Sequence, residues 1–158
     1  MAEPTLIHNT FVLERNYPVT PDRVFSAFAD PSKKRRWFLE GRAHDVEHYE
    51  MDFRAGGKEC SRIRFKEGAP VAGMQCTNQI SYVDIVPNRR IVFTSTMSLG
   101  EHCISASLAT FELLPAQAGT DLIFTHQCVF FEGADGPQMR EAGWRGLLDQ
   151  LKHATETA

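Results

Sequence analysis

The sequence predicts one α+β domain in which a curved antiparallel sheet of six or seven strands wraps around a long C-terminal helix. Two observations support this fold class. Segments rich in β-branched and aromatic residues alternate with short turn signals through the middle of the chain, and the last segment changes to a helical period. The length of 158 residues fits a single domain, 1–158, with a core from about residue 10 to 153.

The N-terminal part predicts a strand followed by two short helices. Thr10–Tyr17 is the first strand. Thr20 is expected to cap the next helix by accepting a backbone N–H bond, and Pro21 suits its first position. Asp30 ends that helix and can cap a second one through Ser32–Phe38.

Six further strands follow. Their predicted ranges are His44–Phe53, Lys58–Lys66, Gly73–Val86, Arg90–Met97, His102–Leu114 and Thr120–Phe130. The turn signals between them are Gly56-Gly57, Gly68-Ala69-Pro70, Pro87-Asn88, Leu99-Gly100 and Ala118-Gly119. Connections this short make neighbouring strands antiparallel, because a parallel crossover needs a dozen or more residues.

The last segment, Pro137–His153, predicts an amphipathic helix. Its apolar stripe comprises Trp144, Leu147, Leu148 and Leu151 at helical spacing. A sheet of seven strands must curl to bury one face, and this helix is the natural cover. A single helix cannot fill such a concavity, so we expect a pocket between sheet and helix.

Strand alternation and the helical stripe identify candidate residues for the wall of this pocket. They are Phe93, Met97, Phe111, Phe124, His126, Met139, Gly143, Trp144 and Leu147. Gly143 lowers helix stability by about 1 kcal/mol relative to alanine, which indicates a need for space or for close backbone approach. The same aromatic residues also fit a filled core, and the pattern alone does not distinguish the two.

Several segments together resemble START-like proteins of the heat-shock-protein-90 ATPase activator homologue family. They are Tyr17–Phe28, Asp30-Pro31 with Trp37, Met51–Gly57, Tyr82–Thr94, Gly119–Leu122, Thr125-His126 and Gly143-Trp144, in this order. The resemblance extends over roughly Phe11 to Leu151. It implies a helix-grip fold with a hydrophobic cavity. It does not imply one function, since this superfamily includes lipid carriers, hormone receptors, cyclases and chaperone partners.

No catalytic residue, metal site or cofactor is predicted. His126 is either a buried neutral imidazole bonded to a neighbour or a polar contact for a ligand. His44 and His48 would lie about 13 Å apart on a strand, too far for one metal ion, so surface imidazoles are expected. The chain contains no nucleophile elbow, zinc-protease, phosphate-loop or dinucleotide motif.

Charge and hydropathy exclude several classes of partner. The net charge is −3, which gives no basic field for nucleic acid or for an anionic membrane. The basic run Lys33–Arg36 is expected to be a solvated helix face, with an anion or acidic-partner contact as the alternative. The sequence contains no basic segment followed by an apolar run at its start and no apolar run of about 20 residues, so we expect a cytoplasmic protein, monomeric or homodimeric.

The leading functional hypothesis is the binding of a small apolar molecule in the pocket. One alternative is a protein–protein module that modulates a chaperone ATPase or another partner, as the family name implies. The other is an enzyme of cyclase, hydrolase or isomerase type that acts inside the pocket.

The cysteines generate a first prediction. Cys60, Cys76, Cys103 and Cys128 are widely spaced and form no Cys-x-x-Cys pair, so all four should be reduced. At least two should react slowly with a thiol reagent in the native protein, because they lie in or beside the core. Titration with and without denaturant measures this, and a mass showing an intact disulfide after purification without oxidant would contradict it.

Overall fold

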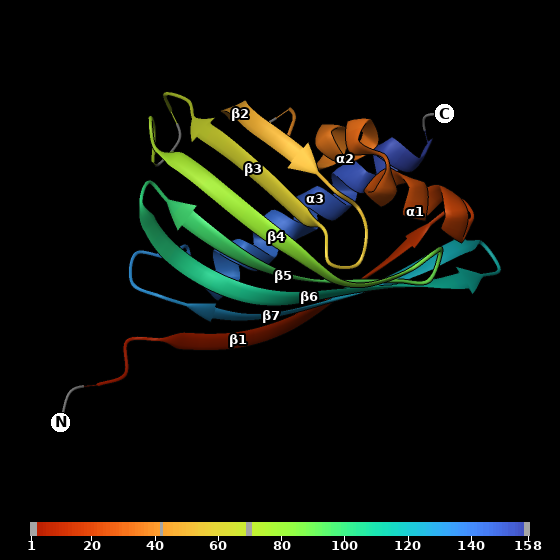
Figure 1. Ribbon diagram of the computed structural model, residues 1–158. Coiled ribbons are helices and arrows are strands. Elements are labelled where there is room, and N and C mark those ends of the chain that lie inside the picture. The colour runs from red at the N-terminus through yellow and green to blue at the C-terminus, as the bar shows by residue number, and fades with distance from the viewer. Residues whose placement is uncertain (1–2, 42, 69–70, 157–158) are drawn as a thin grey trace.

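A computed structural model describes residues 3–41, 43–68 and 71–156, and it shows a seven-stranded antiparallel sheet with three helices on its concave side (Figure 1). The elements are β1 (Ile7–Tyr17), α1 (Pro21–Ala29), α2 (Pro31–Phe38), β2 (His44–Met51), β3 (Lys58–Phe65), β4 (Gln75–Val86), β5 (Arg90–Leu99), β6 (His102–Ala116), β7 (Gly119–Phe130) and α3 (Pro137–Glu156). The predicted fold class is confirmed.

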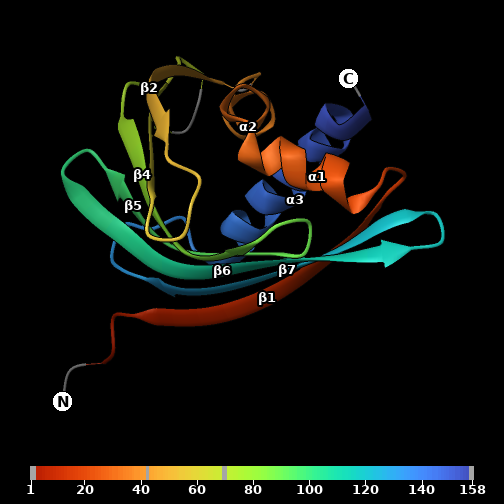
Figure 2. The same cartoon turned by 45° about the vertical axis from the view of Figure 1, so that its right-hand side comes forward.

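The strand order is β1-β7-β6-β5-β4-β3-β2, and every neighbouring pair is antiparallel. The first strand therefore pairs with the last one, with Tyr17 opposite Thr120. β1 and β2 form the two edges, so the sheet is not closed into a barrel. Figure 2 shows how the sheet curls upward from β1 until β2 lies beside the helices.

The two short helices begin as the proline positions predict, but only one of their two predicted side-chain caps forms. Asp30 caps α2 by accepting the N–H groups of Ser32 at 2.9 Å and Lys33 at 3.3 Å. Thr20 occupies the N-cap position of α1 without a side-chain cap bond. Its hydroxyl bonds instead to the Asp22 carboxylate, which lowers the pKa of that carboxyl group. The predicted Thr20 cap is therefore wrong.

α3 lies on an aromatic cluster at the β1, β6 and β7 side of the sheet. The rings of Phe111 and Phe124 are stacked with centroids 4.4 Å apart, and the Trp144 ring lies 4.5 Å from Phe124. At the other end of the contact, the Tyr17 hydroxyl donates to the Leu148 carbonyl at 2.9 Å. These contacts fix the helix over one half of the concave face.

The prediction of a solvated face for Lys33–Arg36 is wrong for Lys34. This residue is 2% exposed, and its Nζ donates to Glu59 Oε1 on β3 at 3.0 Å. The Tyr82 hydroxyl also donates to Glu59. The pKa of Tyr82 is raised, mainly because the hydroxyl is buried and also because this carboxylate is close. Lys34 lies three and four residues from Trp37 and Phe38, so it shares their buried helix face.

The turn between β2 and β3 requires both of its glycines. Gly56 has φ +84°, in the region that favours glycine, and a Cβ on Gly57 would lie 2.0 Å from the Asp52 carbonyl oxygen. In the predicted turn at residues 68–70, Ala69 and Pro70 lie outside the described residues.

The described helices contain none that is long and apolar enough to cross a membrane. All four cysteines are free thiols; Cys76 and Cys128 are buried, and Cys103 is exposed. Burial raises the pKa of the Cys76 thiol to about 11, which makes this cysteine a candidate for one of the slow thiols.

The Lys34–Glu59 pair generates a prediction about stability. Lys34→Met should lower the free energy of unfolding by about 3–5 kcal/mol, because it leaves the Glu59 carboxylate buried without its partner. Urea denaturation measures the loss.

The matched control is Arg35→Ala, which removes an exposed ion pair with Glu40 and should cost less than about 1 kcal/mol. The double variant Lys34→Met/Glu59→Gln should recover part of the loss. Equal stability of Lys34→Met and the wild type would contradict the structural role of the pair.

Candidate functional site

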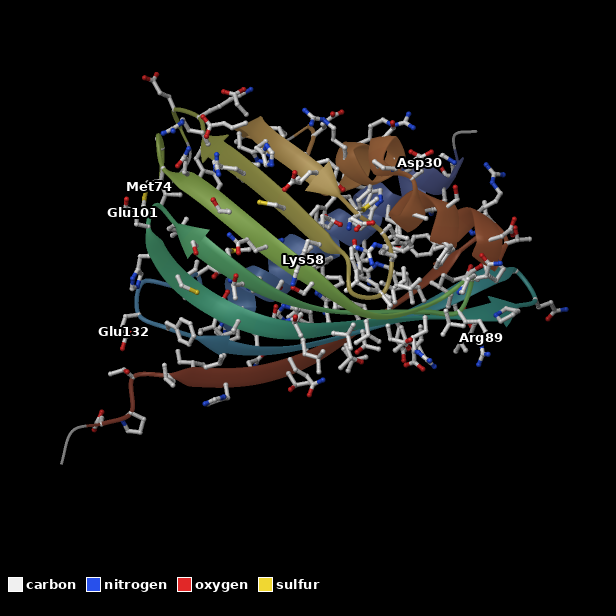
Figure 3. All side chains as sticks on the ribbon, in the orientation of Figure 1. Asp30, Lys58, Met74, Arg89, Glu101 and Glu132 are labelled. Carbon is white, nitrogen blue, oxygen red and sulfur yellow. The ribbon has the colours of Figure 1, made fainter. Side chains whose placement is uncertain are left out.

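A cavity of about 610 Å³ lies between the concave face of β3–β5 and the helices α2 and α3. This volume is within the range of small-molecule sites, roughly 300–1,000 Å³. The cavity lies toward the end of the molecule that Met74, Glu101 and Glu132 mark in Figure 3. It opens to solvent along α3, where Met139 and Gly143 are exposed.

Most of the wall is apolar. Helix α3 contributes Trp144 and Leu147, and the Trp144 ring lies 6.0 Å from that of Phe38 at the end of α2. The remaining apolar side chains include Leu39, Ile63, Phe65, Met97, Leu99 and Ile104. Such a lining favours an apolar ligand, because burying apolar surface from water is favourable.

Gly143 leaves space at the mouth of the cavity. A Cβ atom built on this residue would meet nothing within 4 Å, and its backbone is ordinary helix. The sequence allows two reasons for a glycine here, a need for space or a close approach of backbone. The structure shows the first.

One end of the cavity holds an ion pair whose arginine is buried and whose aspartate is partly exposed. Arg140 is 7% exposed, and its Nε and Nη2 each donate to the Asp135 carboxylate at 2.7 Å. Nη2 also donates to the Ser105 hydroxyl at 3.0 Å, and the guanidinium lies over the Phe130 ring. This bidentate geometry neutralises the arginine within the protein.

Polar side chains also lie on the sheet floor and at one wall. Ser61 on β3 and Asn78 on β4 are paired residues of adjacent strands, and both line the cavity. The His44 ring lines the wall and is hydrogen-bonded through Nε2 to the Leu39 carbonyl. The described residues contain no group of His, Cys, Asp and Glu that could hold a metal ion.

The family model described as activator of Hsp90 ATPase homolog 1-like protein matches residues 18–156. The chain belongs to this family. No curated protein matches it significantly.

Solved structures of several proteins of similar length have the same fold. A Rhizobium loti protein is 45% identical, with 96% of this chain and 99% of that chain covered and a TM-score of 0.84. An uncharacterised Rhizobium leguminosarum protein is 36% identical, with 96% of each chain covered and a TM-score of 0.88. The AHSA1-like protein of Aeromonas hydrophila, at 21% identity, 94% and 92% coverage and a TM-score of 0.67, shows a similar fold.

The structure divides the predicted cavity residues into two groups. Met97, Met139, Gly143, Trp144 and Leu147 line the cavity. Phe93, Phe111, Phe124 and His126 are buried in the core and do not line it. Phe111 and Phe124 lie against Trp144, and Phe93 packs on Phe111, so the alternative of a filled aromatic core holds for that half of the sheet.

Sequence reasoning missed several lining residues. Residues two apart on one strand face the same side of the sheet, and this spacing was an available signal. The missed residues with this spacing are Ser61 and Ile63 on β3, and Cys76 and Asn78 on β4. Arg140 gave no such signal, because its partner Asp135 lies in the loop before α3. His44, expected as a surface imidazole, is half-buried and lines the cavity, whereas His48 is exposed as expected.

His126 lies deep in the core. It is 2% exposed and stacks on Phe11 with ring centroids 4.7 Å apart. Its Nδ1 has no hydrogen-bond partner among the described residues, so the expected bond to a neighbour is not observed at this atom. Burial, and to a smaller extent the nearby Arg140 charge, lowers the pKa of His126 to about 4.

This lowered pKa generates a prediction about stability and pH. Because the unfolded chain takes up a proton near pH 6.5 and the folded chain only near 4, stability should fall as the pH decreases between these values. The His126 contribution to this fall is up to about 3 kcal/mol. His126→Phe should reduce the pH dependence by that amount in urea melts at pH 7 and pH 4.5.

The exposed His48→Gln variant is the control and should keep the wild-type pH dependence. The same slope in His126→Phe as in the wild type would show that His126 titrates alike in both states.

Proposed function

We propose that the protein binds a small hydrophobic molecule in the cavity between the sheet and α3. The observation that carries the proposal is an apolar space of about 610 Å³ that stays open at Gly143. A ligand of suitable size would exchange contacts between these apolar side chains and water for dispersion contacts with its own atoms.

The aromatic rings at the cavity favour a flat ligand. Phe38 and Trp144 both line it, and their rings are tilted by 41° to each other. A planar molecule inserted against either ring gains the contact energy of an offset or edge-on aromatic pair.

The description of the family is the one observation that favours a second function, an interaction with a chaperone ATPase. Native mass spectrometry of protein purified from its own host distinguishes the two. A retained small molecule supports the cavity proposal, and a co-purifying ATPase supports the second function.

Gly143→Leu tests the cavity directly. The added side chain starts from a lining position with open space around it, so binding of the neutral fluorescent probe N-phenyl-1-naphthylamine should fall by about tenfold or more. The free energy of unfolding should hold or rise by up to about 1 kcal/mol, because leucine is a better helix former than glycine.

Ala142→Leu is the matched control, since it adds the same side chain at the adjacent exposed position, which does not line the cavity. Probe binding by Gly143→Leu at the level of Ala142→Leu would overturn the proposal.

A further inference from the structure

We infer that the ligand is an uncharged, mainly apolar molecule that carries a hydroxyl or carbonyl group, which Ser61 and Asn78 bind by hydrogen bonds. This inference rests on the proposed function and specifies the chemical class of ligand for the same cavity. It follows from two polar side chains that lack partners and from the neutralisation of the charges around them.

Ser61 offers the cavity a hydroxyl that has no hydrogen-bond partner among the described residues. The residue is 4% exposed and lines the cavity, and its hydroxyl makes no hydrogen bond to any described residue. Buried polar side chains nearly always have a partner, because an unmade bond costs the desolvation of the group. Ser61 lines the cavity, so a ligand in the cavity can supply this partner.

Asn78 provides a second polar group at the same place. It is the residue directly opposite Ser61 on the adjacent strand, it lines the cavity, and its amide has no hydrogen-bond partner among the described residues. Residues opposite each other on one sheet face have Cβ atoms about 4.5–5.5 Å apart. One oxygen of a ligand can therefore contact both side chains.

The chemistry of the pair suits a neutral oxygen group. A serine hydroxyl donates and accepts, and an asparagine amide offers two donors and an acceptor. Together they match a ligand hydroxyl, which both donates and accepts, or a carbonyl, which accepts from both. Neither side chain supplies the charge that a buried ionic group needs.

The charges beside the cavity are already paired. Arg140 and Asp135 are the one cation–anion pair among the described lining residues, and they bind each other in a bidentate pair. Lys34, which lies over the ring of the lining residue Phe38, is bound to Glu59. A carboxylate ligand would enter an apolar space without an unpaired cation, so the cavity disfavours it.

Three probes of one shape test the inference: naphthalene, 2-naphthol and 2-naphthoate, each competed against N-phenyl-1-naphthylamine. In the double variant Ser61→Ala/Asn78→Leu, the affinity for 2-naphthol relative to naphthalene should fall by about three- to tenfold compared with the wild type. Each single variant should show part of this fall. In the wild type, 2-naphthoate should bind at least about tenfold more weakly than 2-naphthol.

Thr77→Val is the matched control, because it removes a hydroxyl from β4 at the position between Cys76 and Asn78, on the opposite sheet face. It should leave the affinity ratio unchanged. Retained naphthalene binding shows in each variant that the cavity is intact, so loss of folding cannot imitate the expected result.

Three outcomes would overturn the inference, and they are distinguishable. An unchanged ratio in the double variant rules out a role for Ser61 and Asn78 and leaves the apolar cavity in place. Tighter binding of 2-naphthoate than of 2-naphthol assigns the cavity to anions. Binding of none of the three probes by the wild type removes the proposed function as well.

Discussion

The architecture depends on one geometric constraint: a single long helix must cover the concave face of a sheet seven strands wide. A helix with its side chains is about 10–12 Å across, and strands lie about 4.8 Å apart, so one helix covers two or three strands. α3 covers the β1, β6 and β7 half through Trp144 and the phenylalanines beneath it. α2 and the strongly curved β2–β3 edge enclose the other half from the side, and the space between them is the cavity.

Two ion pairs, one buried and one partly buried, join the helices beside the cavity to neighbouring elements. Lys34–Glu59 joins α2 to β3, and Arg140–Asp135 joins the first turn of α3 to the loop before it. Each charge has a partner and further contacts, Tyr82 in the first pair and Ser105 in the second. The two pairs therefore place charged groups near the cavity without adding net charge there.

The sequence predicts the fold well because the helices and strands follow from hydrophobic periods that are visible locally in the sequence. The last helix was expected at Pro137–His153 and is observed at Pro137–Glu156, and the first strand begins three residues before the expected Thr10. The cavity was predicted less well, since alternation shows that Phe124 and Ser61 both face inward but not which of them α3 covers. Lys34 was misread because its partner, Glu59, lies 25 residues away and a run of basic residues is usually solvated.

The Lys34–Glu59 pair also bears on how fast a bound molecule can exchange. An outward movement of α2 would separate two charges in apolar surroundings. We therefore expect this helix to stay in place when a ligand enters or leaves. The margin of α3 offers an easier route, since Met139 is an exposed, unbranched side chain and Gly143 has none. Exposed side chains change rotamer in picoseconds to nanoseconds, whereas helix displacements take microseconds or longer. We therefore expect the residence time to be set by the affinity of the ligand and not by the opening of the protein.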